Sequence, residues 1–154
     1  MYNKILLPID GSNHSKLAAK HAIDITDTNN GEITVLFVIE PNYPRLPVLP
    51  IATLPTPDET YYDELREEAN KIIEEFEVEI EKNQLAGKCQ NINFNTIIRE
   101  GKAHIEILET MNKTDFDLIV MGASGRHNTI DRFALGSVTE MVIRESKIPV
   151  MVIP

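Results

Sequence analysis

The chain has 154 residues, of which 42% are hydrophobic and 25% are charged, and its formal net charge is −9. This size and composition predict one globular domain, spanning residues 1–154, with a single hydrophobic core. They exclude two classes of protein. No apolar run approaches the roughly 18 residues that a membrane span needs, and no basic stripe is present to bind the phosphates of a nucleic acid.

The amino terminus and the cysteine content indicate a cytoplasmic protein. Pro8 and Asp10 interrupt the first apolar run too early for a signal peptide. Cys89 is the only cysteine, so no intramolecular disulfide can form, as expected in a reducing compartment. We expect Cys89 to be a core or boundary thiol rather than a nucleophile, since no partner base is evident.

The first predicted elements are a strand and a helix. Lys4–Ile9 is a compact apolar run that predicts a buried strand, and the Asp10-Gly11 pair predicts a turn after it. Ser12 or Asn13 can cap the helix that follows. The apolar stripe predicted for this helix comprises Leu17, Ala18, His21, Ala22 and Ile25. On this stripe His21 is interpreted as a hydrogen-bonded packing residue rather than a catalytic one.

The middle of the chain combines a strand, a proline-rich loop and a long helix. Glu32–Glu40 is rich in β-branched residues and predicts a strand covered on both faces. Six prolines in residues 41–57 exclude a helix or a central strand, so we expect a surface loop. From Asp58 to Leu85 a long amphipathic helix is predicted, ended by Gly87. Its predicted apolar stripe is Leu65, Ala69, Ile72, Phe76 and Ile80.

Most of the net charge lies on this long helix. Asp58–Lys82 contains 11 acidic and 3 basic residues. We interpret the acidic excess as a solvated helix face rather than as a docking surface.

The carboxyl-terminal part continues the alternation of strands and helices. Its predicted elements are a strand near a sheet edge at Asn91–Glu100, a helix from after Gly101 to about Thr114, a buried strand at Asp117–Ala123, a helix from Gly136 to about Ser146, and a last strand at Pro149–Ile153. Such alternation predicts a five-stranded parallel sheet with helices on both faces, a three-layer α/β/α fold with right-handed crossovers.

In this architecture ligands bind beyond the carboxyl ends of the strands, where the strand order reverses. Asp10, Val38, Gly101 and the Gly122–Gly125 turn all follow or end a predicted strand. We therefore expect them at one edge of the sheet. Asp10 could bind ribose hydroxyls or help to hold a metal, or it could be only a turn residue. Val38 could offer backbone groups and an apolar wall to a base, or belong to the core.

The stretch GASGRHNTIDRFALGS, residues 122–137, has the composition of an anion-binding loop. Gly122 and Gly125 follow a strand, and a turn without Cβ atoms lets backbone N–H groups approach a phosphate. Gly136 and Ser137 stand at the start of a helix, where Ser137 could cap the helix or donate its hydroxyl to an anion. Arg126 could add positive charge near the phosphates or face solvent. The alternative is that these glycines serve only turns.

The patterns G-x-x-x-x-G-K-[ST] and G-x-G-x-x-G are absent, so this is neither a usual P-loop protein nor a dinucleotide-binding one.

The segments ILLPIDGS, VLFVIEP, LIVMGASG and LGSVTEMVIRESKIPVMVI together resemble the universal stress protein family, in its nucleotide-binding branch. The resemblance covers nearly the whole chain and is most specific in its carboxyl-terminal half. It implies a five-stranded parallel, Rossmann-like fold of the adenine nucleotide alpha hydrolase type. It also implies a homodimer formed through the last strand, Val150, Met151, Val152 and Ile153.

The same resemblance implies ATP as the ligand, alone or with Mg²⁺ or Mn²⁺. By position it assigns Asp10 to the ribose and Val38 to the adenine. It places the phosphates against Gly136, Ser137, Val138 and Thr139. The other residues that it places around the nucleotide are Pro8, Gly101, Met121, Gly122 and Gly125.

One spacing departs from the family pattern, in which nine residues separate G-x-x-G from G-[ST]. Here ten residues lie between Gly125 and Gly136. The extra residue could be absorbed as a bulge, or it could move Ser137 away from the phosphates.

Three functions remain open from the sequence. The first is an ATP-binding stress-response or signalling protein whose nucleotide occupancy biases a homodimer. The second is a slow ATPase or phosphotransferase, which needs a group that positions water and cationic charge on the γ-phosphate. The third is a dimeric interaction module of the same family that does not bind nucleotide. We expect binding without efficient turnover.

Overall fold

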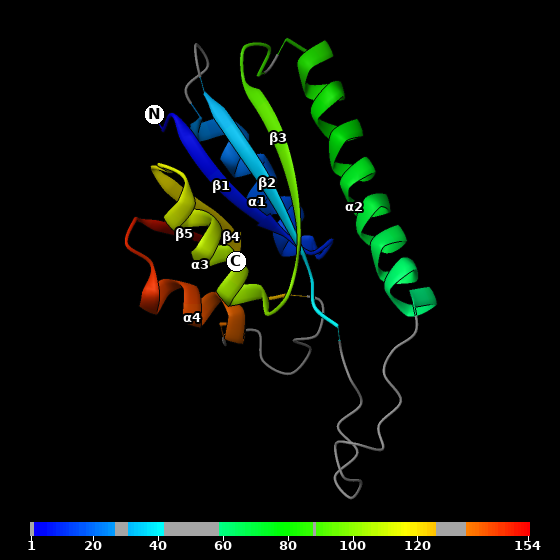
Figure 1. Cartoon of the computed structure of the whole chain (residues 1–154). Helices are drawn as coiled ribbons and strands as arrows, with labels where there is room; N and C mark the ends of the chain where they lie inside the picture. Colours follow the sequence, from blue (N-terminus) through cyan, green and yellow to red (C-terminus); the bar gives the residue numbers. More distant parts are fainter. Residues whose placement is uncertain (1, 27–30, 42–58, 88, 126–134) are drawn as a thin grey trace, which may run out of the picture.

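The computed structural model describes residues 2–26, 31–41, 59–87, 89–125 and 135–154. Strands and helices alternate along the chain as predicted (Figure 1). The elements are β1 Lys4–Ile9, α1 Asn13–Ile25, β2 Glu32–Ile39, α2 Glu59–Leu85, β3 Asn93–Glu100, α3 Ala103–Lys113, β4 Leu118–Gly122, α4 Ser137–Glu145 and β5 Val150–Ile153. The predicted loop at residues 41–57 lies almost entirely outside the described residues.

The five strands form one parallel sheet in the order β3-β2-β1-β4-β5. The register pairs Ile5 of β1 with Ile33 of β2 on one side and with Leu118 of β4 on the other. The chain builds outward from β1 to β3 and then crosses to β4, so the strand order reverses between β1 and β4. The predicted fold class is confirmed, as is the position of β3 at a sheet edge.

Helices cover both faces of the sheet and give it two separate core clusters. α1 and α2 pack on one face and α3 and α4 on the other (Figure 1). Ile5, Leu6 and Leu7 are successive residues that point to alternate faces, and all three are fully buried. Burying each such side chain contributes about 1.5–3 kcal/mol. A strand that is apolar at every position therefore needs helices on both sides, as found here.

The predicted apolar stripe of α1 is confirmed at Ala18, Ala22 and the partly buried Ile25, and it is wrong at Leu17 and His21. Its buried residues are Ser15, Ala18, Ala19, Ala22 and Ile23. Leu17, by contrast, is 42% exposed. His21 is also exposed and is not a packing residue. The reason is that α1 lies close to β4: a Cβ added to Gly122 would stand 2.7 Å from the Cβ of His14. This close approach favours alanine over leucine on the inner side of the helix.

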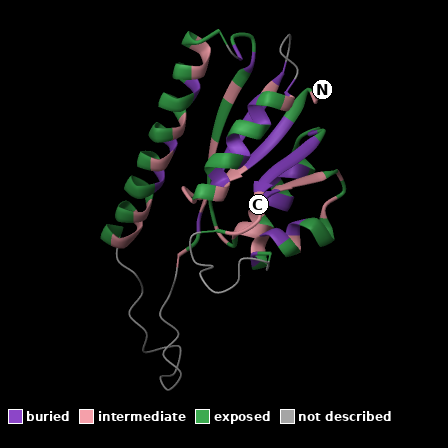
Figure 2. Cartoon of the chain, turned by 180° about the vertical axis from the view of Figure 1, so that it is seen from behind, coloured by how far each residue is buried: buried purple, intermediate pink, exposed green. Residues whose placement is uncertain are grey.

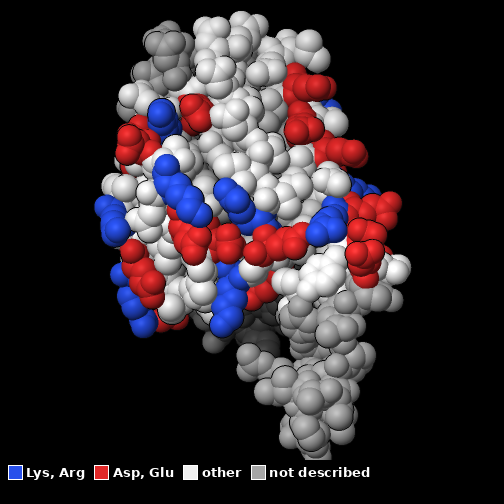
Figure 3. Space-filling view, in the orientation of Figure 1, with Lys and Arg blue, Asp and Glu red and all other residues white. Residues whose placement is uncertain are grey.

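The long helix α2 is amphipathic as predicted. Ala69, Ile73 and Ile80 are buried, whereas its acidic side chains face solvent (Figures 2 and 3). Arg66 connects α2 to the end of β3, with its Nη2 2.8 Å from Glu100 Oε1. The hydrogen bond to the Glu100 carboxylate raises the pKa of Arg66.

Two smaller expectations concern residues that follow α2. Gly87 ends the helix with a φ of +80°, as the sequence predicts. Cys89 is buried, in agreement with its interpretation as a core or boundary thiol.

None of the helices in the described part of the chain has the length and apolar composition that crossing a bilayer requires.

Candidate functional site

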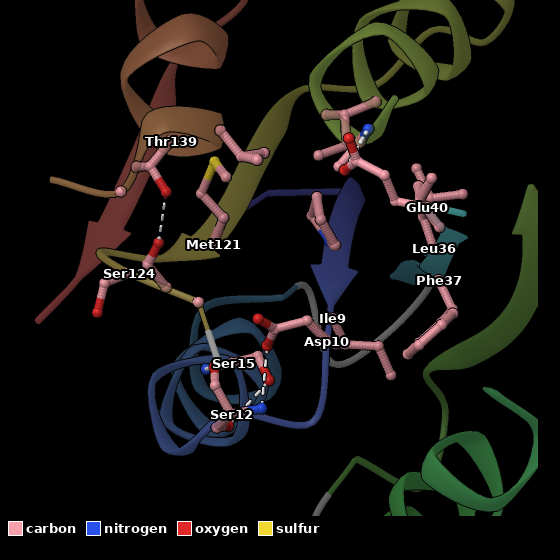
Figure 4. A pocket seen from close by; sticks show the side chains of 18 of the residues that line it. Ile9, Asp10, Ser12, Ser15, Leu36, Phe37, Glu40, Met121, Ser124 and Thr139 are labelled. Carbon is pink, nitrogen blue, oxygen red and sulfur yellow. Dashed lines mark hydrogen bonds between the residues drawn. The ribbon is translucent and has the colours of Figure 1, made fainter. Parts of the chain in front are cut away.

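A pocket opens at the carboxyl ends of β1, β2 and β4, where the strand order reverses (Figure 4). Its volume is about 860 Å³, within the range of small-molecule sites. The first turns of α3 and α4 and one side of α2 complete its walls. The sheet topology thus creates a ligand-sized pocket at the edge that the alternation of strands and helices predicts.

Ten of the twelve candidate residues line this pocket. They are Pro8, Asp10, Val38, Met121, Gly122, Gly125, Gly136, Ser137, Val138 and Thr139. Gly101 is not among the lining residues: its N–H donates to the Ile39 carbonyl at 3.0 Å, and its φ of +152° turns the chain into α3. Ala103 lines the wall there instead. Arg126 lies outside the described residues.

The three candidate glycines differ in what a side chain would meet. A Cβ on Gly122 would lie 2.7 Å from the Cβ of His14 and 2.9 Å from its carbonyl carbon, so this glycine permits helix–strand packing. Among the described residues, a Cβ on Gly125 would meet the Asp10 carboxylate, 2.7 Å from Oδ2. A Cβ on Gly136 would stand 3.2 Å from Ser124 Cα. Gly136 thus permits the close approach of the glycine turn to the start of α4, and Gly125 permits the close approach of Asp10 to that turn.

Helix α4 directs its amino terminus at the same pocket. Gly136 is its N-cap and makes no side-chain capping bond. The Glu140 N–H donates to the Gly136 carbonyl at 2.9 Å and is the first to find an acceptor within the helix. The N–H groups of residues 137–139 precede it, and together with the helix dipole they favour an anion. Ser137 is the first helical residue and is exposed, so it is not the cap.

The Thr139 hydroxyl is already engaged in the fold. Thr139 is buried, and its Oγ1 donates to the Gly122 carbonyl at 2.9 Å (Figure 4). Because the hydroxyl is engaged, the donor that Thr139 can offer to a ligand is its backbone N–H in the first turn of α4. The hydroxyl instead ties α4 to the end of β4.

Asp10 takes part in a turn and also faces the glycines. Its Oδ1 accepts from the Ser12 N–H at 2.9 Å, and the Ser12 hydroxyl caps α1 by accepting from the Ser15 N–H at 3.1 Å. The other carboxylate oxygen, Oδ2, lies beside Gly125. Both interpretations made from the sequence, turn residue and ligand-facing carboxylate, are compatible with this geometry.

The comparisons with known proteins agree with this architecture. A model described as "Universal stress protein family" matches residues 1–154. The chain belongs to the universal stress protein family. Universal stress protein MJ0531 of Methanocaldococcus jannaschii is 33% identical to it, over 99% of this chain and 82% of that protein.

Solved structures of the universal stress protein family share the fold. UspA from Lactobacillus plantarum has a TM-score of 0.75 at 27% identity, over 99% of this chain and 98% of that one. A family protein from Arabidopsis thaliana, with AMP bound, has a TM-score of 0.62 at 16% identity, over 98% of this chain and 90% of that one. At that identity the second structure shows the fold alone.

The longer spacing between the glycine pairs does not separate them in this universal stress protein. The Gly136 N–H donates to the Ala123 carbonyl at 2.8 Å, and the Ala123 N–H donates to Ile153 of β5 at 2.7 Å. The two turns are thus hydrogen-bonded to each other and to the sheet. Ser137 remains on the pocket wall. The intervening residues 126–134, where the bulge is expected, lie outside the described residues.

Several pocket residues were not found from the sequence. Glu40 and Glu68 add carboxylates to the wall, and Ser12, Ser15 and Ser124 add hydroxyls. Ser124 Oγ lies 3.2 Å from Nδ1 of His14, which joins the glycine turn to the first turn of α1. Ser124 stands inside the G-x-x-G motif and Glu40 ends a predicted strand, so both positions carried a signal. No group of three metal-ligating side chains occurs among the described residues.

Proposed function

We propose that this protein is an ATP-binding universal stress protein, a cytoplasmic regulatory protein whose nucleotide occupancy biases a homodimer. One observation carries the proposal: Gly125, Gly136, the amino terminus of α4 and Asp10 all meet on a single pocket. Backbone N–H groups without an obstructing Cβ suit phosphates, and a carboxylate suits ribose hydroxyls. The AMP bound to the Arabidopsis thaliana protein of the same fold supports the choice of an adenine nucleotide.

The order of the strand ends fits the order of parts in a nucleotide. β4, β1 and β2 are neighbours in the sheet, and strands lie about 4.8 Å apart. The phosphates would lie at Gly125 and α4, the ribose at Asp10 and the base at Val38. If Mg²⁺ or Mn²⁺ accompanies ATP, phosphate oxygens supply most of its ligands, and Asp10 is the candidate protein ligand.

The charged side chains that line the pocket in the described part of the chain support binding with slow turnover. The carboxylates of Asp10, Glu40, Glu68 and Glu140 line it. Hydrolysis requires cationic groups that neutralise charge developing on the γ-phosphate, and carboxylates oppose this. We therefore propose a role in which the bound nucleotide acts as a signal.

The homodimer would form along β5. This strand pairs with β4 on one side and is an edge of the sheet, and Val150, Met151 and Val152 are only half-buried. An apolar edge strand offers unpaired backbone groups to a second copy. The predicted interface therefore comprises Val150, Met151, Val152 and Ile153.

The test is the nucleotide content of the purified protein. Mass spectrometry after denaturation should identify an adenine nucleotide, and ATP added to nucleotide-free protein should raise the temperature of unfolding. ATP held at the site should remain largely intact over hours, as followed by chromatography of the released nucleotide. The absence of bound nucleotide, together with no heat stabilisation by ATP with Mg²⁺, would overturn the proposal. Rapid release of ADP would instead favour an ATPase.

A further inference from the structure

Glu40 lies at the end of β2, on the side of the pocket opposite the glycine turns. Figure 4 shows it across the pocket from Ser124 and Thr139. Its Oε2 accepts a hydrogen bond from the Ala103 N–H at 3.3 Å. Lys102, the N-cap of α3, makes no side-chain capping bond, so Glu40 caps this helix from the neighbouring strand. The contact holds the carboxylate at the pocket wall.

The second oxygen of this carboxylate is the chemically informative one. Among the described residues no hydrogen bond engages Glu40 Oε1. A carboxylate only accepts hydrogen bonds, so a ligand group that meets Oε1 must be a donor. The apolar residues Leu36, Val38 and Ile107 belong to the same pocket lining, and of these Val38 is partly exposed while Leu36 and Ile107 are buried.

The position along the sheet identifies which part of a nucleotide reaches Glu40. Two strand spacings, about 10 Å, separate the glycine turn after β4 from the end of β2. With phosphates at Gly125 and ribose at Asp10, the base falls beside Val38 and Glu40. This step depends on the proposed function, because it takes the phosphate position from it.

We infer that Glu40 is a specificity-determining residue that selects a 6-aminopurine. The exocyclic amine of adenine donates to Glu40 Oε1. Guanine and hypoxanthine carry an oxo group at the same position, whose lone pairs repel the carboxylate, and their N1–H reaches Oε1 only if the base shifts within the pocket. In the pose of adenine such a ligand leaves its oxo oxygen and Glu40 Oε1 without a donor, and because Glu40 is exposed this weakens binding rather than abolishing it.

The test compares ATP with inosine triphosphate, which has the same ribose and phosphates. Calorimetry on nucleotide-free protein gives both dissociation constants. Because the ribose and phosphates are the same, the ratio of these constants reports only the contacts to the base. The wild-type protein should bind ATP about tenfold or more tightly than inosine triphosphate. In Glu40→Gln the ratio should fall to one or below, because the side-chain NH2 group then takes the place of Oε1 and donates to an oxo group but not to an amine. The amide oxygen also keeps the acceptor for the Ala103 N–H, so the α3 cap is preserved.

Glu109→Gln is the matched control. Glu109 is an exposed residue of α3 whose carboxylate pairs with Lys113 at 3.1 Å. The substitution removes the same charge near the same helix without touching the pocket, so the ratio should stay at the wild-type value. A ratio near one in the wild type, or a wild-type ratio in Glu40→Gln, would overturn the role of Glu40 while ATP binding stands. Failure of the wild type to bind either nucleotide would overturn the proposed function and this inference together.

Discussion

Two aspartates at opposite ends of neighbouring strands show how chain direction divides structural from ligand-facing roles. Asp117 precedes β4, and its Oδ2 accepts from the N–H groups of Asn3 and Lys4 at 2.9 and 2.8 Å. Its own N–H donates to the Lys4 carbonyl at 2.8 Å. Asp10 follows β1, and its carboxylate lies beside a glycine on a pocket. At the amino ends of the strands the carboxylate joins β1 to β4. At the carboxyl ends it stands where a ligand can reach it.

This difference follows from the direction of a parallel sheet. Each strand ends at the same edge, and the next helix begins there with N–H groups that have no acceptor inside the helix. At α4 these groups face the pocket, whereas at α1 the Ser12 side chain caps one of them. The carboxyl edge thus keeps unpaired donors beside the place where the strand order reverses.

The largest effect should come from closing the space beside Gly125. In Gly125→Val the new side chain meets the Asp10 carboxylate and fills the turn where phosphates would lie. The affinity for ATP should fall by at least about 100-fold, which corresponds to about 2.8 kcal/mol. Calorimetry measures the loss, and the unfolding temperature of the nucleotide-free variant should stay close to that of the wild type.

Gly122→Ala is the control within the same turn. Its Cβ would meet the Cβ and backbone of His14 and come within 3.1 Å of the Ser15 nitrogen, so α1 must move away from β4. Overpacking of this kind costs about 1–3 kcal/mol of stability. Chemical denaturation should therefore show a lower free energy of unfolding. Equal loss of stability in both variants would show that the two glycines do not differ in role.

The fold could be predicted from the sequence because local and global signals agree. The apolar runs at Lys4–Ile9 and Leu118–Gly122 are long enough only for buried strands, and the alternation with helices fixes a parallel sheet. The position of the site follows from that topology. Even the error at Leu17 of α1 has a local cause: Leu17 and Ala19 both fit a helical stripe, and only the distance to β4 decides between them.

The details of the site required the structure. Gly101 fits the family position but serves the turn into α3. Glu40 reaches the pocket only because α3 lies beside the end of β2, a contact between segments 63 residues apart. The hydrogen bond from Gly136 to Ala123 could not be read from the spacing either. Such contacts depend on tertiary packing rather than on the pattern of any one segment.

Replacing each of the two aspartates in a separate variant tests the comparison directly. Asp10→Asn keeps an oxygen for the Ser12 N–H but removes the negative charge beside Gly125. The affinity for ATP should fall by about tenfold, or about 1.4 kcal/mol, because the proposed carboxylate contact to the ribose is weakened. The free energy of unfolding should change little. Asp117→Ala removes the acceptor for two N–H groups and should lower the free energy of unfolding by about 1–2 kcal/mol. Its ATP dissociation constant should equal that of the wild type. A binding defect in Asp117→Ala without loss of stability would contradict the division between the two edges.

The smallest effects should separate two hydroxyls on the first turn of α4. Ser137 is exposed on the pocket wall, so Ser137→Ala should weaken ATP binding only a few-fold, as expected for one hydrogen bond of about 1 kcal/mol or less. Thr139 is buried, and its hydroxyl bonds to the Gly122 carbonyl. Thr139→Val keeps the shape and loses that bond, so it should lower the free energy of unfolding by about 1 kcal/mol. The ATP dissociation constant of Thr139→Val should remain unchanged, because its backbone N–H is retained. The opposite pattern, with Thr139→Val affecting binding alone, would mean that the hydroxyl leaves Gly122 to meet the phosphates.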